Sequence, residues 1–66
     1  MTASPRAVKR EERRRAFVSA FINTQVQAAG EPVRLYAEKA AEQYWQMHRW
    51  RFYGPEELAR IDMRYW

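Results

Sequence analysis

The positions of proline and glycine constrain the fold of this chain more than any other feature of its sequence. Pro5, Pro32 and Pro55 stand where helices can begin, because proline lacks the N–H that the first helical turn leaves unpaired anyway. Gly30 and Gly54 stand where helices can end, since glycine adopts the backbone conformation that closes a helix. The segments between them show no alternating strand pattern and no internal repeat. We therefore predict a compact all-α protein of three helices, at about residues 5–29, 32–53 and 55–65.

Length and composition exclude several classes of function. The 66 residues form a single small domain, 1–66, and contain no cysteine, which excludes disulfides and cysteine-based zinc sites. The single histidine, His48, excludes a site with two histidine ligands, and we expect it to be packed on the apolar face of the second helix. The sequence has no glycine-rich phosphate loop and no Ser/His/Asp set. It therefore predicts a protein that is not an enzyme and binds no cofactor and no metal.

Positive charge is concentrated near the beginning of the chain. Residues 1–30 carry six basic and two acidic side chains, whereas residues 31–66 carry six of each, so the whole net charge of +4 comes from the first segment. An asymmetry of this kind indicates an acidic partner, which is a nucleic acid, an anionic lipid surface or an acidic patch on a protein.

Most of these cations share one face of the first predicted helix. Arg6, Lys9, Arg10 and Arg13 follow the spacing i, i+3, i+4, i+7, which places them along one basic stripe. Four cations cannot be buried without partners, so we expect the first helix to project beyond the packed body, with residues 1–12 projecting or frayed. The candidate basic site consists of Arg6, Lys9, Arg10, Arg13 and Arg14.

Several partners fit such a stripe. The run of residues 6–15 resembles in composition the arginine-rich peptides of phage antitermination proteins, without assigning the chain to that family. The resemblance implies a helix that binds the phosphates of RNA or DNA by displacing counterions. The alternatives are an acidic protein patch and a merely solvated basic face. A membrane surface is not expected, because no bulky apolar face accompanies the stripe.

Aromatic residues are concentrated at the other end of the chain, where residues 44–66 contain seven of the ten. On a continuous helix, Trp45 and Trp50 would point about 140° apart, so we expect that both cannot enter one small core. Tryptophan, tyrosine and arginine dominate protein interfaces, and exposed aromatic rings also stack on bases. The alternative is a core in which aromatics replace aliphatic residues. The candidate partner-binding residues are Trp45, Arg49, Trp50, Arg51, Tyr53, Arg64 and Trp66.

These features together predict a protein that works by binding. The first hypothesis is a small adaptor or inhibitor that docks on a larger protein or protein–nucleic acid machine through the aromatic and arginine surface and the basic helix. Cysteine-free binders of this size are common among phage-like accessory proteins. The second is a direct DNA- or RNA-binding protein that uses the first helix. The third is a structural subunit whose aromatics pack between identical chains, as in a homodimer. The longest apolar run, residues 16–22, is far shorter than the ~20 residues of a membrane span, so we expect a cytoplasmic protein.

Overall fold

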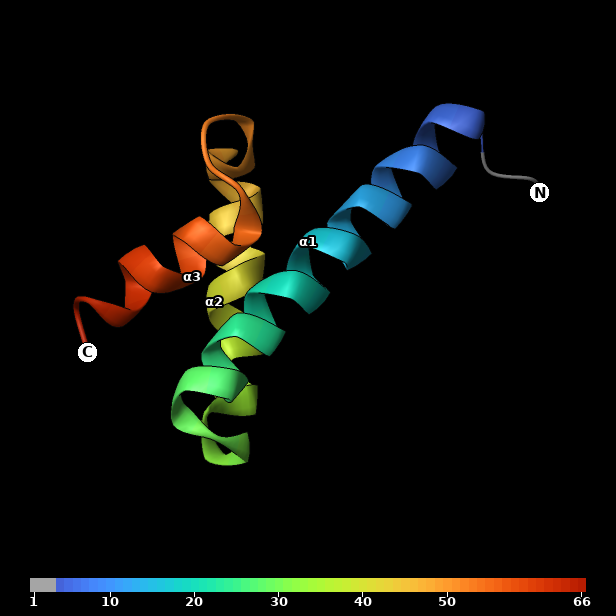
Figure 1. Ribbon diagram of the computed structural model, residues 1–66. Coiled ribbons are helices and arrows are strands. Elements are labelled where there is room, and N and C mark those ends of the chain that lie inside the picture. The colour runs from blue at the N-terminus through green and yellow to red at the C-terminus, as the bar shows by residue number, and fades with distance from the viewer. Residues whose placement is uncertain (1–3) are drawn as a thin grey trace.

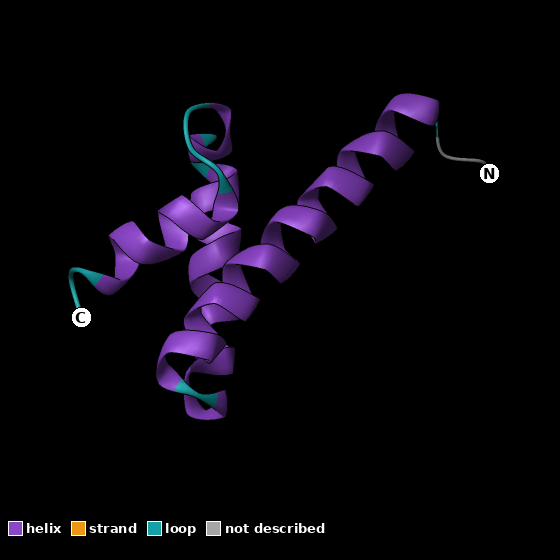
Figure 2. Cartoon of the chain, in the orientation of Figure 1, coloured by secondary structure: helices purple, strands orange, loops and turns teal. Residues whose placement is uncertain are grey.

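The protein is built from helices alone in the part of the chain that the computed structural model describes, residues 4–66. Three α-helices, α1 (Pro5–Ala29), α2 (Arg34–Gln46) and α3 (Pro55–Met63), alternate with two short 3-10 turns, η1 (Glu31–Val33) and η2 (Arg49–Arg51). Figure 2 shows helix along nearly all of this range. The predicted all-α, three-helix fold is confirmed. Residues 1–3 of the predicted projecting segment lie outside the described residues.

The ends of α1 form as the proline and glycine pattern predicts. The Ser4 side chain accepts a hydrogen bond of 3.2 Å from the backbone N–H of Ala7, and Pro5 follows as the first helical residue. A cap of this kind stabilises a helix by about 1 kcal/mol. At the other end Gly30 has a φ of 90°, which side-chain-bearing residues rarely adopt, and its N–H donates to the carbonyl of Val26.

The predicted second helix is too long at both ends. Residues 32 and 33 belong to the η1 turn, and α2 ends at Gln46 instead of continuing to residue 53. The break comes at His48, which has a φ of 58° and a ψ of 24° in the left-handed region. The chain reverses there, passes through the η2 turn and reaches Gly54, which caps α3.

This reversal explains why the two tryptophans do not diverge. Trp50 folds back onto Trp45, with ring centroids 4.6 Å apart and an angle of 18° between the planes. The expected divergence of the two rings is not observed: Trp45 is buried, and the half-buried Trp50 packs against the core without being one of its buried members. The stack shields indole surface from water, and the reversal places one residue, His48, in the left-handed conformation. His48, expected to be packed, is exposed on the outside of the turn.

One small core holds the three helices together. Its buried members are aromatic on α1, small on α2 apart from one indole, and aliphatic on α3: Phe17, Phe21, Ala40, Ala41, Trp45, Leu58 and Ala59. The alanines let the helix backbones approach closely, so that the large rings of α1 fill the space between α2 and α3. Figure 1 shows the second half of α1 crossing α2, while its first turns lead away from both other helices. The molecule is accordingly elongated, with extents of 41 × 24 × 14 Å.

A carboxylate on α3 joins all three helices. Asp62 accepts hydrogen bonds from Gln25 Nε2 of α1 at 2.9 Å and from the hydroxyls of Tyr36 and Tyr44 of α2 at 2.7 and 3.1 Å. Burial, together with the hydrogen bond to Asp62, raises the pKa of Tyr44 to about 12. The indole N–H of Trp66 also reaches this group, at 3.4 Å from Asp62 Oδ2. These bonds fix the end of the chain to the bundle.

Candidate functional site

The basic stripe and the stacked tryptophans face each other across one hollow. It has a volume of about 370 Å³ and lies between the first half of α1 and the η2 turn. We call it the cationic groove. Its lining consists of Arg6, Lys9, Arg10, Arg13, Trp45, His48, Trp50 and Arg51, and includes no carboxylate. The groove therefore carries five formal positive charges and one titratable imidazole.

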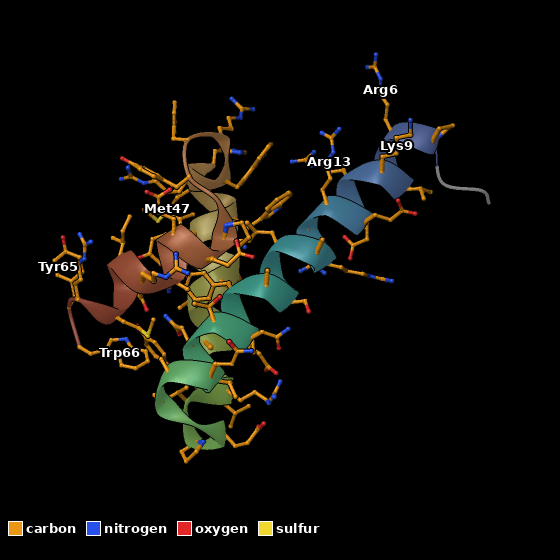
Figure 3. The ribbon with its side chains drawn as sticks, in the orientation of Figure 1. Arg6, Lys9, Arg13, Met47, Tyr65 and Trp66 are labelled. Carbon is orange, nitrogen blue, oxygen red and sulfur yellow. The ribbon has the colours of Figure 1, made fainter. Side chains whose placement is uncertain are left out.

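The α1 wall of the groove is exposed and electrostatically unbalanced. Arg6, Lys9, Arg10 and Arg13 are all exposed, and none of them forms an ion pair with any other residue between 4 and 66. Figure 3 shows Arg6 and Arg13 extending from the side of α1 that is nearer the η2 turn. Because no carboxylate of the described chain neutralises these charges, an anion that entered the groove would meet uncompensated donors.

Arg14 lies outside the groove. Its guanidinium donates to Glu11, with Nη2 2.7 Å from Oε1, and to Glu42 of α2, so that it ties α1 to α2. The hydrogen bonds from Arg14 lower the pKa of Glu11 to about 2, and Arg15 adds a weaker contact at 3.3 Å. Four of the five predicted basic residues therefore line one groove, whereas the fifth serves the fold.

Aromatic rings and the fifth cation, Arg51, form the opposite wall. The wall contains the stacked indoles of Trp45 and Trp50, and the Arg51 guanidinium lies 5.5 Å from the centroid of the Trp50 ring. The His48 ring lies 6.2 Å from that of Trp50, at an angle of 59°. This wall thus combines planar rings with cations, which is the combination that stacks on bases and attracts phosphates.

The indole nitrogen of Trp50 is a buried donor without a partner among the described residues. An unpaired buried donor costs about 1–3 kcal/mol, and native structures contain few of them. Its position at the groove means that the free protein leaves one hydrogen-bonding group unused next to its most charged surface.

The predicted aromatic and arginine surface is divided into separate places. Trp45, Trp50 and Arg51 line the cationic groove, whereas Arg49 and Tyr53 border a different hollow of about 320 Å³ with Met47, Tyr44, Leu58, Ile61 and Tyr65. Trp66 packs edge-on against Tyr36, with ring centroids 5.7 Å apart. Arg64 is exposed just beyond α3. Figure 3 shows Met47 and Tyr65 on the side of the molecule opposite Arg6, Lys9 and Arg13.

Sequence reasoning missed two groups of residues. His48 was not recognised as a groove residue, because its place depends on the chain reversal that the tryptophan stack requires. Met47 and Tyr65 are not among the predicted partner-binding residues, yet both are largely exposed. For them the only available signal was the excess of large apolar side chains over what three short helices can bury.

A further hollow contains carboxylates. It has a volume of about 650 Å³, lies between α1 and α2, and is bordered by Glu38, Lys39 and Glu42. It therefore lacks the single sign of charge that the cationic groove has. Nowhere in residues 4–66 do three or more His, Cys, Asp or Glu side chains gather to hold a metal ion.

Comparison of the chain with protein-family models, with curated proteins and with solved structures finds no match. No helix among the described residues has the length and apolar character needed to cross a membrane. Function is therefore inferred from the groove itself.

Proposed function

We propose that this protein is a non-enzymatic binding protein that holds a nucleic acid in its cationic groove. The observation that supports the proposal is the lining of the groove, which combines five cations and two stacked indoles with no carboxylate. A surface of one sign inside a concave site concentrates the opposite charge, and phosphates are the anions that basic helices bind most often.

The spacing of the cations along α1 suits a phosphate chain. Arg6 and Arg13 are separated by seven residues, or about 10 Å at the helical rise of ~1.5 Å per residue. Along the axis of a duplex each strand places a phosphate about every 3.4 Å, so the stripe spans roughly three such steps. Four side chains with long flexible stems can each reach one of these phosphates.

The aromatic wall favours a nucleic acid over an acidic protein segment. Carboxylates of a peptide would pair with the cations, but they would leave the indoles and the imidazole without a partner of matching shape. Bases supply flat faces for Trp50, Arg51 and His48, while their phosphates satisfy the α1 wall. An acidic peptide is accordingly an outcome that the experiment must exclude.

A salt titration with a charge-matched control tests the proposal. Binding of RNA and of DNA is measured for the wild type, for Arg10→Ala/Arg13→Ala and for Lys39→Ala/Arg60→Ala. The control residues are exposed, form no ion pair within residues 4–66 and lie outside the groove. The slope of log K against log salt is about −0.7 to −0.9 per phosphate bound. Arg10→Ala/Arg13→Ala removes two phosphate contacts, so its slope should be less negative than that of the wild type by about 1.5. Equal slopes for the two double variants, or no binding to either nucleic acid, would contradict the proposal.

A second candidate function, an adaptor or inhibitor that docks on a larger protein, is favoured by the other hollow. Met47 is 56% exposed and Tyr65 83% exposed, and both border that hollow beside Arg49 and Tyr53. Exposed aromatics flanked by arginine are typical of interface hot spots. We expect a protein partner recovered from cell extract to stay bound after nuclease treatment. The double variant Tyr53→Ser/Tyr65→Ser should no longer recover this partner. A partner that nuclease removes would contradict this second function.

A further inference from the structure

The basic stripe is exposed and borders a hollow that the protein's own turn also lines. Arg6, Lys9, Arg10 and Arg13 line the same hollow as residues 48–51 of the reversal. In Figure 1 the first turns of α1 and the η2 region form two arms that diverge from the helix crossing. Any ligand that contacts all four cations must therefore enter between these arms.

This geometry discriminates against a duplex. A helix reads double-stranded DNA by entering a major groove about 12 Å wide, which requires the contacting face of the helix to be unobstructed. Here the contacting face of α1 lines the same hollow as Trp50 and Arg51, so it is not an unobstructed face.

From this arrangement we infer that the groove binds single-stranded nucleic acid, with the phosphates along α1 and a base against Trp50 and Arg51. The inference rests on the proposed function and names its substrate class. Unpaired bases expose the faces and edges that aromatic and guanidinium groups recognise, whereas bases within a duplex are already stacked. RNA and single-stranded DNA share this chemistry.

The unpaired indole N–H of Trp50 supports the same arrangement. The atom is shielded in the free protein and has no acceptor among the described residues. A base or phosphate oxygen that reached this nitrogen would supply the missing acceptor. Binding would then remove an unfavourable feature of the free structure, in addition to adding phosphate contacts.

The test compares strands of about 12 nucleotides, within the range of single-strand site sizes. Oligouridylate, oligothymidylate and a duplex of the same length are titrated by anisotropy, and a polyglutamate peptide forms a fourth arm. We expect both single strands to bind at least ten-fold more tightly than the duplex, and the ratio of the first two distinguishes RNA from DNA. Tryptophan fluorescence should be quenched by the single strands and not by the duplex.

Two variants localise the base. Trp50→Leu keeps an apolar side chain against Trp45 but removes the stacking face, so single-strand affinity should fall about ten-fold, as for one lost stack. Trp66→Phe is the matched control, since Trp66 lies outside the groove, and it should leave affinity unchanged. Circular dichroism verifies that each variant is folded. If Trp50→Leu unfolds, Arg51→Ala replaces it, with an expected loss of several-fold.

The outcomes separate this inference from the proposed function. Equal or tighter binding of the duplex, still dependent on Arg10 and Arg13, would overturn single-strand binding and leave nucleic-acid binding in place. Binding of polyglutamate alone, or of none of the four probes, would overturn both. Single-strand preference without any effect of Trp50→Leu or Arg51→Ala would overturn the assignment of the base.

Discussion

Replacing Asp62 with alanine should destabilise the protein more than any other change to an acidic residue. The carboxylate accepts hydrogen bonds from Gln25, Tyr36 and Tyr44, and through them it joins α3 to both other helices. Gln25 is fully buried and Tyr44 is half-buried, so water cannot fully replace the lost acceptor at these two donors. The Tyr36 hydroxyl lies at an exposed position, where water can replace it.

The size of the effect follows from the two shielded donors. A buried donor that loses its acceptor costs about 1–3 kcal/mol, but Gln25 Nε2 keeps a second bond of 3.3 Å to the carbonyl of Ala59. A total loss of about 2–4 kcal/mol is therefore expected from Asp62→Ala. For a domain of this size 1 kcal/mol corresponds to about 4–8 °C, so the melting temperature should fall by roughly 10–25 °C.

Thermal unfolding followed by circular dichroism measures this loss. Glu57→Ala is the matched control, because Glu57 is an exposed carboxylate on the same helix with no ion pair inside residues 4–66. Its change should cost only a few tenths of a kcal/mol, through the helix dipole. If Asp62→Ala melts within about 3 °C of the control, the network does not hold the helices together and the reasoning is refuted.

The remaining predictions concern pH and truncation. Because the pKa of Tyr44 is raised to about 12 from 10.0, its contribution to stability is fully present below pH 10 and is lost as pH rises toward 12. In melting curves recorded from pH 10 to 12, Tyr44→Phe should therefore lose less stability with rising pH than the wild type. An unchanged pH dependence would contradict the raised pKa of Tyr44. Because the pKa of Glu11 is lowered to about 2 from 4.5, its contribution to stability is present above pH 4.5 and is lost as pH falls toward 2. Glu11→Gln should therefore reduce the loss of stability between pH 4.5 and 2. If the wild type and the variant lose stability equally over this range, the ion pair of Glu11 with Arg14 does not stabilise the fold. Deleting residues 1–12 should change the melting temperature only slightly while abolishing nucleic-acid binding, and a large loss of stability would mean that the first turns pack on the body.

The helix boundaries that could be predicted are those that depend on local chemistry. Pro5 and Gly30 specify the two ends of α1 through a missing N–H and a positive φ, and neither effect needs the rest of the fold. The stripe of four cations could likewise be predicted, since it follows from helical spacing alone. Its exposure follows from the cost of burying charge without partners.

The end of α2 could not be predicted, because a tertiary contact determines it. Nothing in the local sequence around His48 requires a left-handed residue, and residues 47–53 contain no glycine or proline before Gly54. Beyond the end of the helix, Trp50 has a stacking partner and a place beside the core, which the local sequence does not specify. The groove depends on the same reversal, so sequence reasoning found its two walls separately and could not join them.

Arg14 and Asp62 illustrate the same limit. In the sequence Arg14 looks like one more cation of the basic stripe. Its partner Glu42, however, lies 28 positions away on α2. Asp62 is an unremarkable acidic residue in a short helix until Gln25 and Tyr44 meet it in the folded state. Long-range pairs of this kind depend on how the helices cross, which local patterns do not encode.

The measurement that tests the central claim most directly is a residue-resolved NMR titration with a short single-stranded oligonucleotide. If the cationic groove is the binding site, the shifts will concentrate on backbone amides of residues 6–13 and 48–51 and on the indole N–H of Trp50. The indole N–H of Trp66 and the amides around Tyr65 will stay in place. Shifts concentrated on residues 53–66, or spread evenly over all exposed basic residues, would contradict the account.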